Sequence, residues 1–236
     1  MRLYCFHSAG AGTLSFAPWP RLLGPSVEVV PVLLPGRDTR VREARVTDLT
    51  GLHRELHGAI DTRPGDPYAL YGHSLGGLVA HHLAVTWHRF AETPPRLLVV
   101  GAALPPHVPL PLLDTDEPTE RQLLELLSHS GALSLSRDVL YRYLLPLLRD
   151  DLALARALRR AANRPAGVPL LAVSGARDTL ADARRMAGWD RWTTAGFTAR
   201  TVPGDHFFVR EPALTGLLTD VLGSTTTGPA TEPTTA

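Results

Sequence analysis

The chain has 236 residues, a length at which α/β folds commonly form a single domain. Hydrophobic residues make up 44% of it, and 24 basic residues nearly balance 23 acidic ones, for a net charge of +1. This balance argues against a long-range field for nucleic acid or an anionic membrane. The single cysteine, Cys5, excludes an intrachain disulfide, and we expect it to be buried. No signal-peptide or membrane-spanning pattern is present, so we expect a soluble, cytoplasmic and monomeric protein.

Strand-like and helix-like segments alternate along much of the chain, which is typical of a mostly parallel sheet covered by helices. Strands are predicted at Arg2–Phe6, Val27–Leu34, Tyr68–Tyr71, Arg96–Ala102, Val168–Ser174 and Phe197–Val202. Helices are predicted at Thr47–Asp61, Leu75–Phe90 and Glu211–Leu222.

The alternation stops between Pro105 and Pro165, where the sequence is rich in leucine and lacks strand patterns. Helices are predicted there at Glu120–Ser128, Ser136–Leu148 and Asp150–Ala162. We interpret residues 105–165 as a helical lid inserted between two sheet strands, and residues 1–104 and 166–223 as the two parts of the core. Residues 224–236 contain almost nothing apolar and are expected to be a disordered tail.

The segment Gly72-His73-Ser74-Leu75-Gly76 fits the pattern G-x-S-x-G. It directly follows a predicted strand and directly precedes a predicted helix. That setting is typical of a nucleophile elbow, in which glycines make room for a tight turn that exposes the serine hydroxyl. The alternative is a phosphate-binding turn, but neither G-x-G-x-x-G nor a P-loop pattern is present. The sequence therefore predicts an α/β-hydrolase fold with Ser74 as the nucleophile.

A serine hydroxyl is a weak nucleophile until a base takes its proton, and in this fold the base lies late in the chain. Among the ten histidines, His206 follows the last predicted strand and precedes the last helix, so we predict it as the base. His129 in the lid is the next candidate. The histidines on predicted helices are interpreted as solvated or packed; they are His53, His57, His81, His82 and His88.

A histidine base needs a carboxylate that fixes its tautomer. Asp178 lies on the loop that follows the strand Val168–Ser174, and we predict it as this acid. Three aspartates compete with it. Asp182 is expected to cap a helix, Asp190 lies further along a helical stretch, and Asp205 adjoins the histidine and is expected to point elsewhere.

Acyl transfer to a serine also creates an oxyanion, which needs preorganised N–H donors. One predicted donor is the backbone N–H of Leu75, which follows the nucleophile. The other comes from the small-residue turn His7–Gly12, and we choose Ala9, with Ser8 second. His7 and His73 flank this region and are given no chemical role.

Together these segments resemble the type II thioesterases, the stand-alone editing thioesterases of polyketide and non-ribosomal peptide synthases. The resemblance runs from residue 1 to about Leu222. It rests on Phe6–Gly12, Phe16–Trp19, Leu34–Arg37, Gly72–Gly76, Leu145–Asp151, Gly175–Asp178, Trp189 and Gly204–Phe208. Two departures from the family pattern are His7-Ser8, where the family has Pro-Tyr or Pro-Phe, and Asp205, where a glycine is common.

The resemblance implies hydrolysis of acyl thioesters from the phosphopantetheine arm of acyl or peptidyl carrier proteins, so that stalled or mis-primed chains are removed from a synthase. No metal-ligand spacing appears in the sequence, and we expect no metal, no cofactor other than the arm carried by the partner, no nucleic acid and no membrane. Four arginines are candidates for contact with an acidic carrier domain, with a solvated surface as the alternative for each: Arg37, Arg40, Arg142 and Arg149.

Three other functions remain open at this point. A small-molecule carboxylesterase or lactonase and an acyltransferase would use the same three residues, and their substrates would separate them. A non-catalytic binding protein would lack one of the three, whereas this sequence retains a serine, a histidine and an aspartate in the expected order.

Overall fold

The computed structural model describes residues 1–62, 65–113, 115, 117–127 and 136–226. Within them, six strands form one parallel sheet with the order β2-β1-β3-β4-β5-β6. The strands are β1 (Arg2–Phe6), β2 (Glu28–Val32), β3 (Tyr68–His73), β4 (Leu98–Gly101), β5 (Leu170–Gly175) and β6 (Phe197–Val202). The predicted parallel sheet is thereby confirmed. The central strands β3, β4 and β5 are buried along their whole length, as expected for runs of leucine and valine in a parallel sheet.

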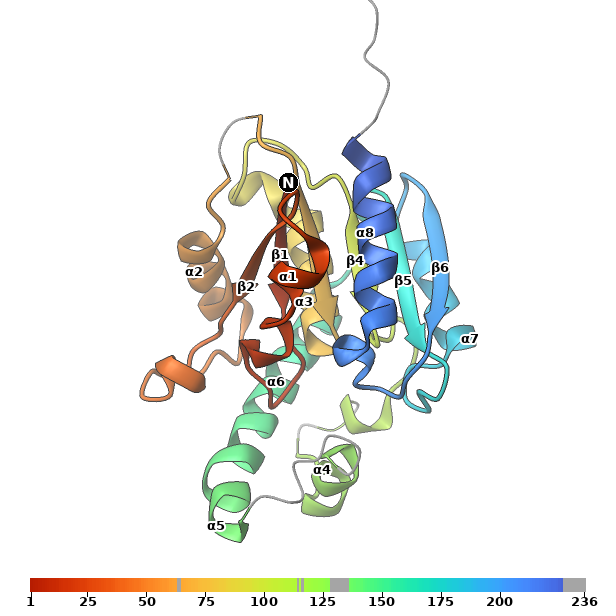
Figure 1. Cartoon of the computed structure of the whole chain (residues 1–236). Helices are drawn as coiled ribbons and strands as arrows, with labels where there is room; N and C mark the ends of the chain where they lie inside the picture. Colours follow the sequence, from red (N-terminus) through yellow and green to blue (C-terminus); the bar gives the residue numbers. More distant parts are fainter. Residues whose placement is uncertain (63–64, 114, 116, 128–135, 227–236) are drawn as a thin grey trace, which may run out of the picture.

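Helices cover both faces of the sheet (Figure 1). One face packs against α1 (Trp19–Leu23) and α8 (Pro212–Thr226), and the other against α2 (Leu49–Ala59), α3 (Leu75–Thr86) and α7 (Ala183–Met186). Asp48 caps α2 by accepting the N–H of Gly51. The free thiol of Cys5 is buried, as predicted. Short 3-10 turns occur at Thr13–Phe16, Asp38–Arg40, Trp87–Arg89, Pro111–Leu113, Ala187–Trp192 and Phe208–Arg210.

The closing helix α8 runs to Thr226 and so includes the first three residues of the expected tail, 224–226. The other residues of that expected tail, 227–236, lie outside the described part of the chain.

The lid segment contains α4 (Glu120–Leu127), α5 (Arg137–Val139), a π-helical turn at Leu140–Leu144, and α6 (Leu145–Ala161). The prediction of two helices, separated near Arg149, is wrong, because the chain is helical without a break from Arg137 to Ala161. Pro146 explains the π turn: proline has no N–H to donate, and the Leu145 N–H bonds back to the carbonyl of Leu140, five residues earlier.

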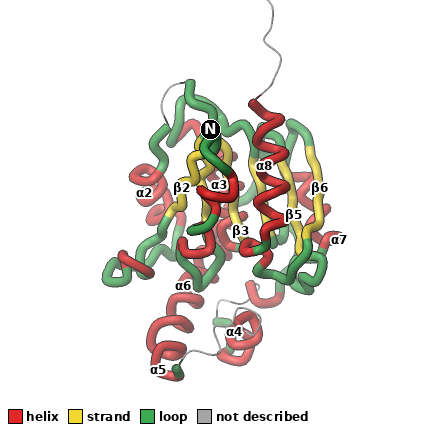
Figure 2. The backbone as a smooth tube through the Cα atoms, in the orientation of Figure 1, coloured by secondary structure: helices red, strands yellow, loops and turns green. Residues whose placement is uncertain are grey.

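The long helix α6 joins the lid to the core (Figure 2). Its first half packs against α4 in a separate apolar cluster, through Leu145, Leu148 and Leu152. Its second half enters the core beside α3, through Leu154 and Leu158. One continuous helix therefore connects α4 of the lid segment with the core.

The carboxyl ends of the strands lie at one edge of the sheet, on the side where α4 and α5 project (Figure 1). Loops at this edge of a parallel sheet are where such folds place their binding and reacting groups. The turn after β1, the turn after β3 and the loops after β5 and β6 all lie there.

Candidate active site

Ser74 stands at the sharp turn between β3 and α3. Its backbone has φ 54° and ψ −116°, a left-handed conformation that is strained for a residue with a side chain. The glycines of the motif make this turn possible. A Cβ on Gly72 would overlap the carbonyl of Gly76, and a Cβ on Gly76 would overlap the carbonyl of Phe6 in β1. The residue spacing therefore produces the strand, turn and helix that the motif predicts.

The structure brings Ser74, His206 and Asp178 together, although they come from three separate loops. The Ser74 Oγ lies 3.3 Å from the Nε2 of His206, and the Nδ1 of His206 lies 2.9 Å from the Oδ2 of Asp178. The other carboxylate oxygen of Asp178 accepts the N–H groups of Leu180 and Ala181, both at 2.9 Å. Because an ionised carboxylate only accepts hydrogen bonds, Nδ1 carries the proton and Nε2 is free to accept the serine hydroxyl.

Asp178 is buried, and burial alone would raise the pKa of its carboxyl. The hydrogen bond and charge of His206, together with the two backbone N–H groups, outweigh burial and hold the pKa of Asp178 below its ordinary value. The carboxylate therefore stays charged well into acid, where it can orient the imidazole.

The competing candidates occupy other roles. Asp182 caps α7 by accepting the N–H of Arg185, as predicted. Asp205 accepts the N–H of Phe207, two residues away. Asp190 lies on an exposed 3-10 turn. His129, the alternative base, lies outside the described residues.

Two backbone N–H groups beside Ser74 lack a hydrogen-bond partner in the described part of the chain. Those of Ala9 and Leu75 have no hydrogen-bond acceptor within the described residues, whereas the neighbouring N–H groups of Gly10 and Ala11 are bonded. Both residues line the cavities that Ser74 borders. This is the arrangement expected of a pair of donors waiting for an oxyanion.

Sequence reasoning gave no role to His73, which the structure places directly beneath His206. The His73 Nε2 donates to the main-chain carbonyl of His206 at 2.7 Å, and its Nδ1 accepts the Tyr71 hydroxyl at 2.8 Å. Burial, followed by the nearby His206, lowers the pKa of His73 to about 3, so it stays neutral and keeps one donor and one acceptor. The sequence held a signal for this contact, because Tyr71 and His73 are two residues apart and so share one face of a strand.

Two cavities meet at Ser74 and His206. The first has a volume of about 390 Å³ and an aliphatic lining, contributed by Leu110, Leu112, Leu113, Leu126, Leu152 and Ala155. The polar side chains of Gln122, Glu125 and Arg159 also border it. The second has a volume of about 340 Å³ and follows the turn from Ser8 to Ser15, with Arg210 among its lining residues. Each falls within the range of small-molecule sites.

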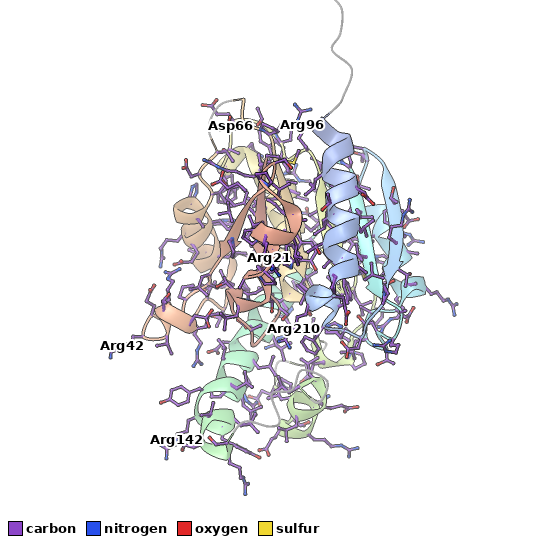
Figure 3. All side chains as sticks on the ribbon, in the orientation of Figure 1. Arg21, Arg42, Asp66, Arg96, Arg142 and Arg210 are labelled. Atoms are coloured by element: carbon purple, nitrogen blue, oxygen red, sulfur yellow. The ribbon has the colours of Figure 1, made fainter. Side chains whose placement is uncertain are left out.

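The four arginines differ in exposure. Arg37 is only 4% exposed and is therefore neither a carrier contact nor a solvated side chain. Arg40 pairs with Glu43 and with Glu55 beside α2, Arg149 donates to the carbonyl of Pro118, and the exposed Arg142 pairs with Asp138. Figure 3 shows Arg142 at the far end of the lid and Arg210 at the end of the core that faces the lid.

Within the residues described, no group of three or more histidine, cysteine, aspartate or glutamate side chains is arranged to hold a metal ion. No helix among those residues combines the length and the apolar character needed to span a bilayer.

Comparison with known proteins decides the family. A family model of the thioesterase domain matches residues 1–224. The chain belongs to the thioesterase family. The structure of RedJ, a thioesterase from the prodiginine biosynthetic pathway in Streptomyces coelicolor, is 32% identical with a TM-score of 0.78, covering 95% of this chain and 89% of RedJ.

Two further relatives extend the comparison. The structure of BorB, the type II thioesterase from the borrelidin biosynthetic cluster, is 26% identical with a TM-score of 0.76, covering 95% of this chain and 91% of BorB. The medium-chain S-acyl fatty acid synthase thioesterase of Rattus norvegicus is 31% identical over 224 residues, covering 89% of this chain and 82% of the rat enzyme. The resemblance to type II thioesterases is thereby confirmed, and so is the prediction that this thioesterase is a thioester hydrolase.

Proposed function

We propose that this thioesterase hydrolyses acyl thioesters from the phosphopantetheine arm of a carrier protein, and so clears aberrant acyl groups from a polyketide or non-ribosomal peptide synthase. The observation that carries the proposal is the hydrogen-bonded order Ser74, His206, Asp178 at the junction of two cavities. RedJ and BorB, which come from the prodiginine biosynthetic pathway and the borrelidin biosynthetic cluster, support the same assignment.

The first half of the reaction transfers the acyl group to the serine. Ser74 Oγ attacks the thioester carbonyl while its proton passes to His206 Nε2, and Asp178 stabilises the imidazolium that forms. The negative charge on the carbonyl oxygen is met by the N–H groups of Ala9 and Leu75. Collapse of this intermediate breaks the C–S bond, and His206 returns the proton to the departing thiolate.

The second half releases the acid. Water attacks the acyl-Ser74 ester as its proton passes to His206, the same two N–H groups meet the new oxyanion, and collapse regenerates the Ser74 hydroxyl with the proton from His206. No cofactor is needed beyond the arm on the substrate, because every proton and bond change is accounted for by these residues and water.

The two cavities divide the substrate between them. The aliphatic cavity suits the acyl chain, since its leucines offer apolar contact without a fixed polar partner. The second cavity suits the pantetheine arm, because it follows the turn Ser8–Ser15 and is bordered by Arg210, whose exposed guanidinium can meet the phosphate of the arm. An acyl or peptidyl carrier protein is then the partner, with this protein acting as a monomer in the cytoplasm.

The decisive experiment measures release of free acid from an acetyl- or propionyl-loaded acyl carrier protein by the wild type and by Ser74→Ala. We expect hydrolysis by the wild type and its loss, by at least about 10⁴-fold, in the variant. An unchanged melting temperature of Ser74→Ala shows that the loss is chemical.

Substrate panels separate the alternatives. Cleavage of aryl esters or lactones without cleavage of acyl-carrier thioesters contradicts the proposal and favours a small-molecule esterase. Release of an ester or amide in the presence of an alcohol or amine, in preference to free acid, favours an acyltransferase. Retained hydrolysis in Ser74→Ala contradicts the serine mechanism itself.

A further inference from the structure

A buried ion pair joins two segments that the proposed chemistry leaves unused. The guanidinium of Arg37, in the loop after β2, makes two parallel bonds to the carboxylate of Asp151 on α6, at 2.7 and 2.9 Å. The side chains are only 3% and 1% exposed. The two residues belong to the Leu-Pro-Gly-Arg segment and the Leu145–Asp151 segment, both of which carried the family resemblance.

Each partner also bonds to the turn that follows β1. The Oδ2 of Asp151 accepts the N–H of Gly10 at 2.7 Å, and the Nη1 of Arg37 donates to the carbonyl of Ala11 at 3.0 Å. The ion pair therefore holds the two residues that follow Ala9: Gly10 through its backbone N–H and Ala11 through its backbone carbonyl.

Further bonds within the turn fix the peptide that contains the Ala9 N–H. The carbonyl of Ser8 accepts the N–H of Ala11 at 3.2 Å and the Nδ1 of His7 at 2.9 Å. Burial, followed by the charge of Arg37, lowers the pKa of His7 to about 4, so the ring is neutral. Because a carbonyl oxygen can only accept, the bond to Ser8 places the single ring proton on Nδ1. In a trans peptide the N–H points opposite to the C=O, so fixing the Ser8 carbonyl also fixes the direction of the Ala9 N–H.

We propose that Arg37 and Asp151 are positioning residues that aim the Ala9 N–H at the oxyanion and tie this turn to the lid helix α6. This proposal rests on the proposed function, because it assigns Ala9 to the oxyanion. It also explains why the N–H of Gly10 does not serve as the donor, since Asp151 already occupies it.

Stability alone is a poor reason for such a pair. Two buried charges lose their hydration, and apolar residues of similar volume are often as stabilising or more so. The planar fork of an arginine against a carboxylate, in contrast, fixes orientation in a way that the single ammonium of lysine cannot. The fixed geometry of the ion pair, rather than its contribution to stability, therefore accounts for its place beside the turn.

The test compares Arg37→Lys and Asp151→Asn with a matched control, Arg40→Lys. Arg40 lies three residues along the same loop and pairs with Glu55, and within the described residues its side chain makes no hydrogen bond to the turn after β1. The substrate is an acyl-N-acetylcysteamine thioester, which needs no protein docking. We expect kcat to fall about tenfold to hundredfold for both site variants with KM changed less than about twofold, since a misaimed donor acts on the transition state. Arg40→Lys keeps the wild-type kcat.

A second measurement reads the oxyanion directly. An alkylboronic acid adds to a serine hydroxyl and places an oxygen where the oxyanion forms, so its affinity falls in parallel with kcat/KM in the two site variants. A loss of melting temperature with unchanged kcat and unchanged boronate affinity overturns the proposal, and so does a change confined to KM.

A paired variant separates positioning from folding. The double substitution Arg37→Met and Asp151→Leu removes both charges together, so no unpaired charge stays buried and the fold is retained. We expect stability close to the wild type but kcat still reduced; recovery of kcat together with stability overturns the proposal. If the wild type hydrolysed no thioester, the proposed function would fail, while boronate affinity across the same variants would still decide the role of the pair.

Discussion

The candidate site has two walls that are held in different ways. The sheet wall is formed by the loops at the carboxyl ends of the strands, and the lid wall is formed by the leucines of the lid segment. On the sheet side, directional hydrogen bonds fix the reacting groups: Asp178 accepts two backbone N–H groups, and His73 supports the main chain of His206. On the lid side, leucines of α4 and α6 pack against one another and line the larger cavity. Hydrogen bonds specify position to a fraction of an ångström, whereas apolar packing specifies shape and volume. Under the proposed function, the sheet wall would set the chemistry and the lid wall would set which acyl chain fits.

Breaking the sheet wall gives the largest expected effect. Asp178→Asn keeps the shape of the side chain but offers an amide in place of a carboxylate, which favours the wrong tautomer of His206. We expect kcat to fall by about 10²-fold to 10⁴-fold, with KM nearly unchanged, in thioester hydrolysis at pH 7.5.

The same substitution has a separate signature in stability. The pKa of Asp178 is lowered in the folded protein, so its stabilising contribution is present above its unfolded pKa, near 4, and is lost as the pH falls through the lower folded value. Urea unfolding of Asp178→Asn is therefore expected to depend less on pH below about 4 than unfolding of the wild type. Equal kcat values for the two proteins would contradict the role of Asp178.

The placement of Ser74, His206 and Asp178 beside one another could be predicted from the sequence, while their catalytic roles stay a prediction. The local spacing predicts Ser74, because a turn that closes within five residues requires glycine at positions 72 and 76. His206 and Asp178 follow from chain order at the ends of strands, and the structure places their side chains within hydrogen-bonding distance of each other.

The parts that were missed depend on contacts between distant segments. Arg37 was expected at the surface or on a partner, because nothing near it in sequence shows that Asp151, 114 residues further on, lies against it. The continuous helix through Arg149 was missed because the charged residues Arg149 and Asp150 interrupt the apolar pattern. The helix continues past them because its leucines pack against α4 on one half and beside α3 on the other. His73 was passed over because the carbonyl to which it donates belongs to His206, 133 residues further on, although its other partner, Tyr71, lies in the same strand.

Filling the lid wall is expected to change chain-length preference and leave the chemistry intact. Leu113 lines only the aliphatic cavity, and Leu113→Trp adds bulk there. We expect kcat/KM to fall about tenfold or more for an octanoyl thioester and to stay within about twofold for an acetyl thioester, because a lost methylene contact costs about 1–3 kcal/mol.

The control for this prediction is Leu22→Trp, since Leu22 is exposed on α1 and borders neither cavity. Equal losses for both chain lengths in Leu113→Trp would show that the bulk disturbs the reacting groups, and would contradict the assignment of this cavity to the acyl chain.

A smaller effect is expected at the mouth of the second cavity. Arg210→Ala removes the exposed guanidinium that we assign to the phosphate of the arm. We expect KM for an acyl-carrier protein to rise about threefold to tenfold, with no change for an acyl-N-acetylcysteamine thioester, which lacks the phosphate. Arg96→Ala, at an exposed position at the end of the core away from the lid, is the control with unchanged KM. A matching rise for the short thioester would place Arg210 in the chemistry instead.

The last prediction concerns stability alone, and it involves α3, which packs against the sheet. His81 on α3 is buried against Trp189 and Trp192, and burial, followed by the charge of His82, lowers its pKa to about 4. Between about pH 6.5 and 4, the unfolded chain binds a proton that the folded protein does not, so stability falls as the pH falls through this window. His81→Phe removes that proton and should flatten the slope of the unfolding free energy by about 1 kcal/mol per pH unit. His88→Phe, at an exposed position, should leave the slope unchanged; equal slopes for His81→Phe and the wild type would show that His81 is protonated in the folded body.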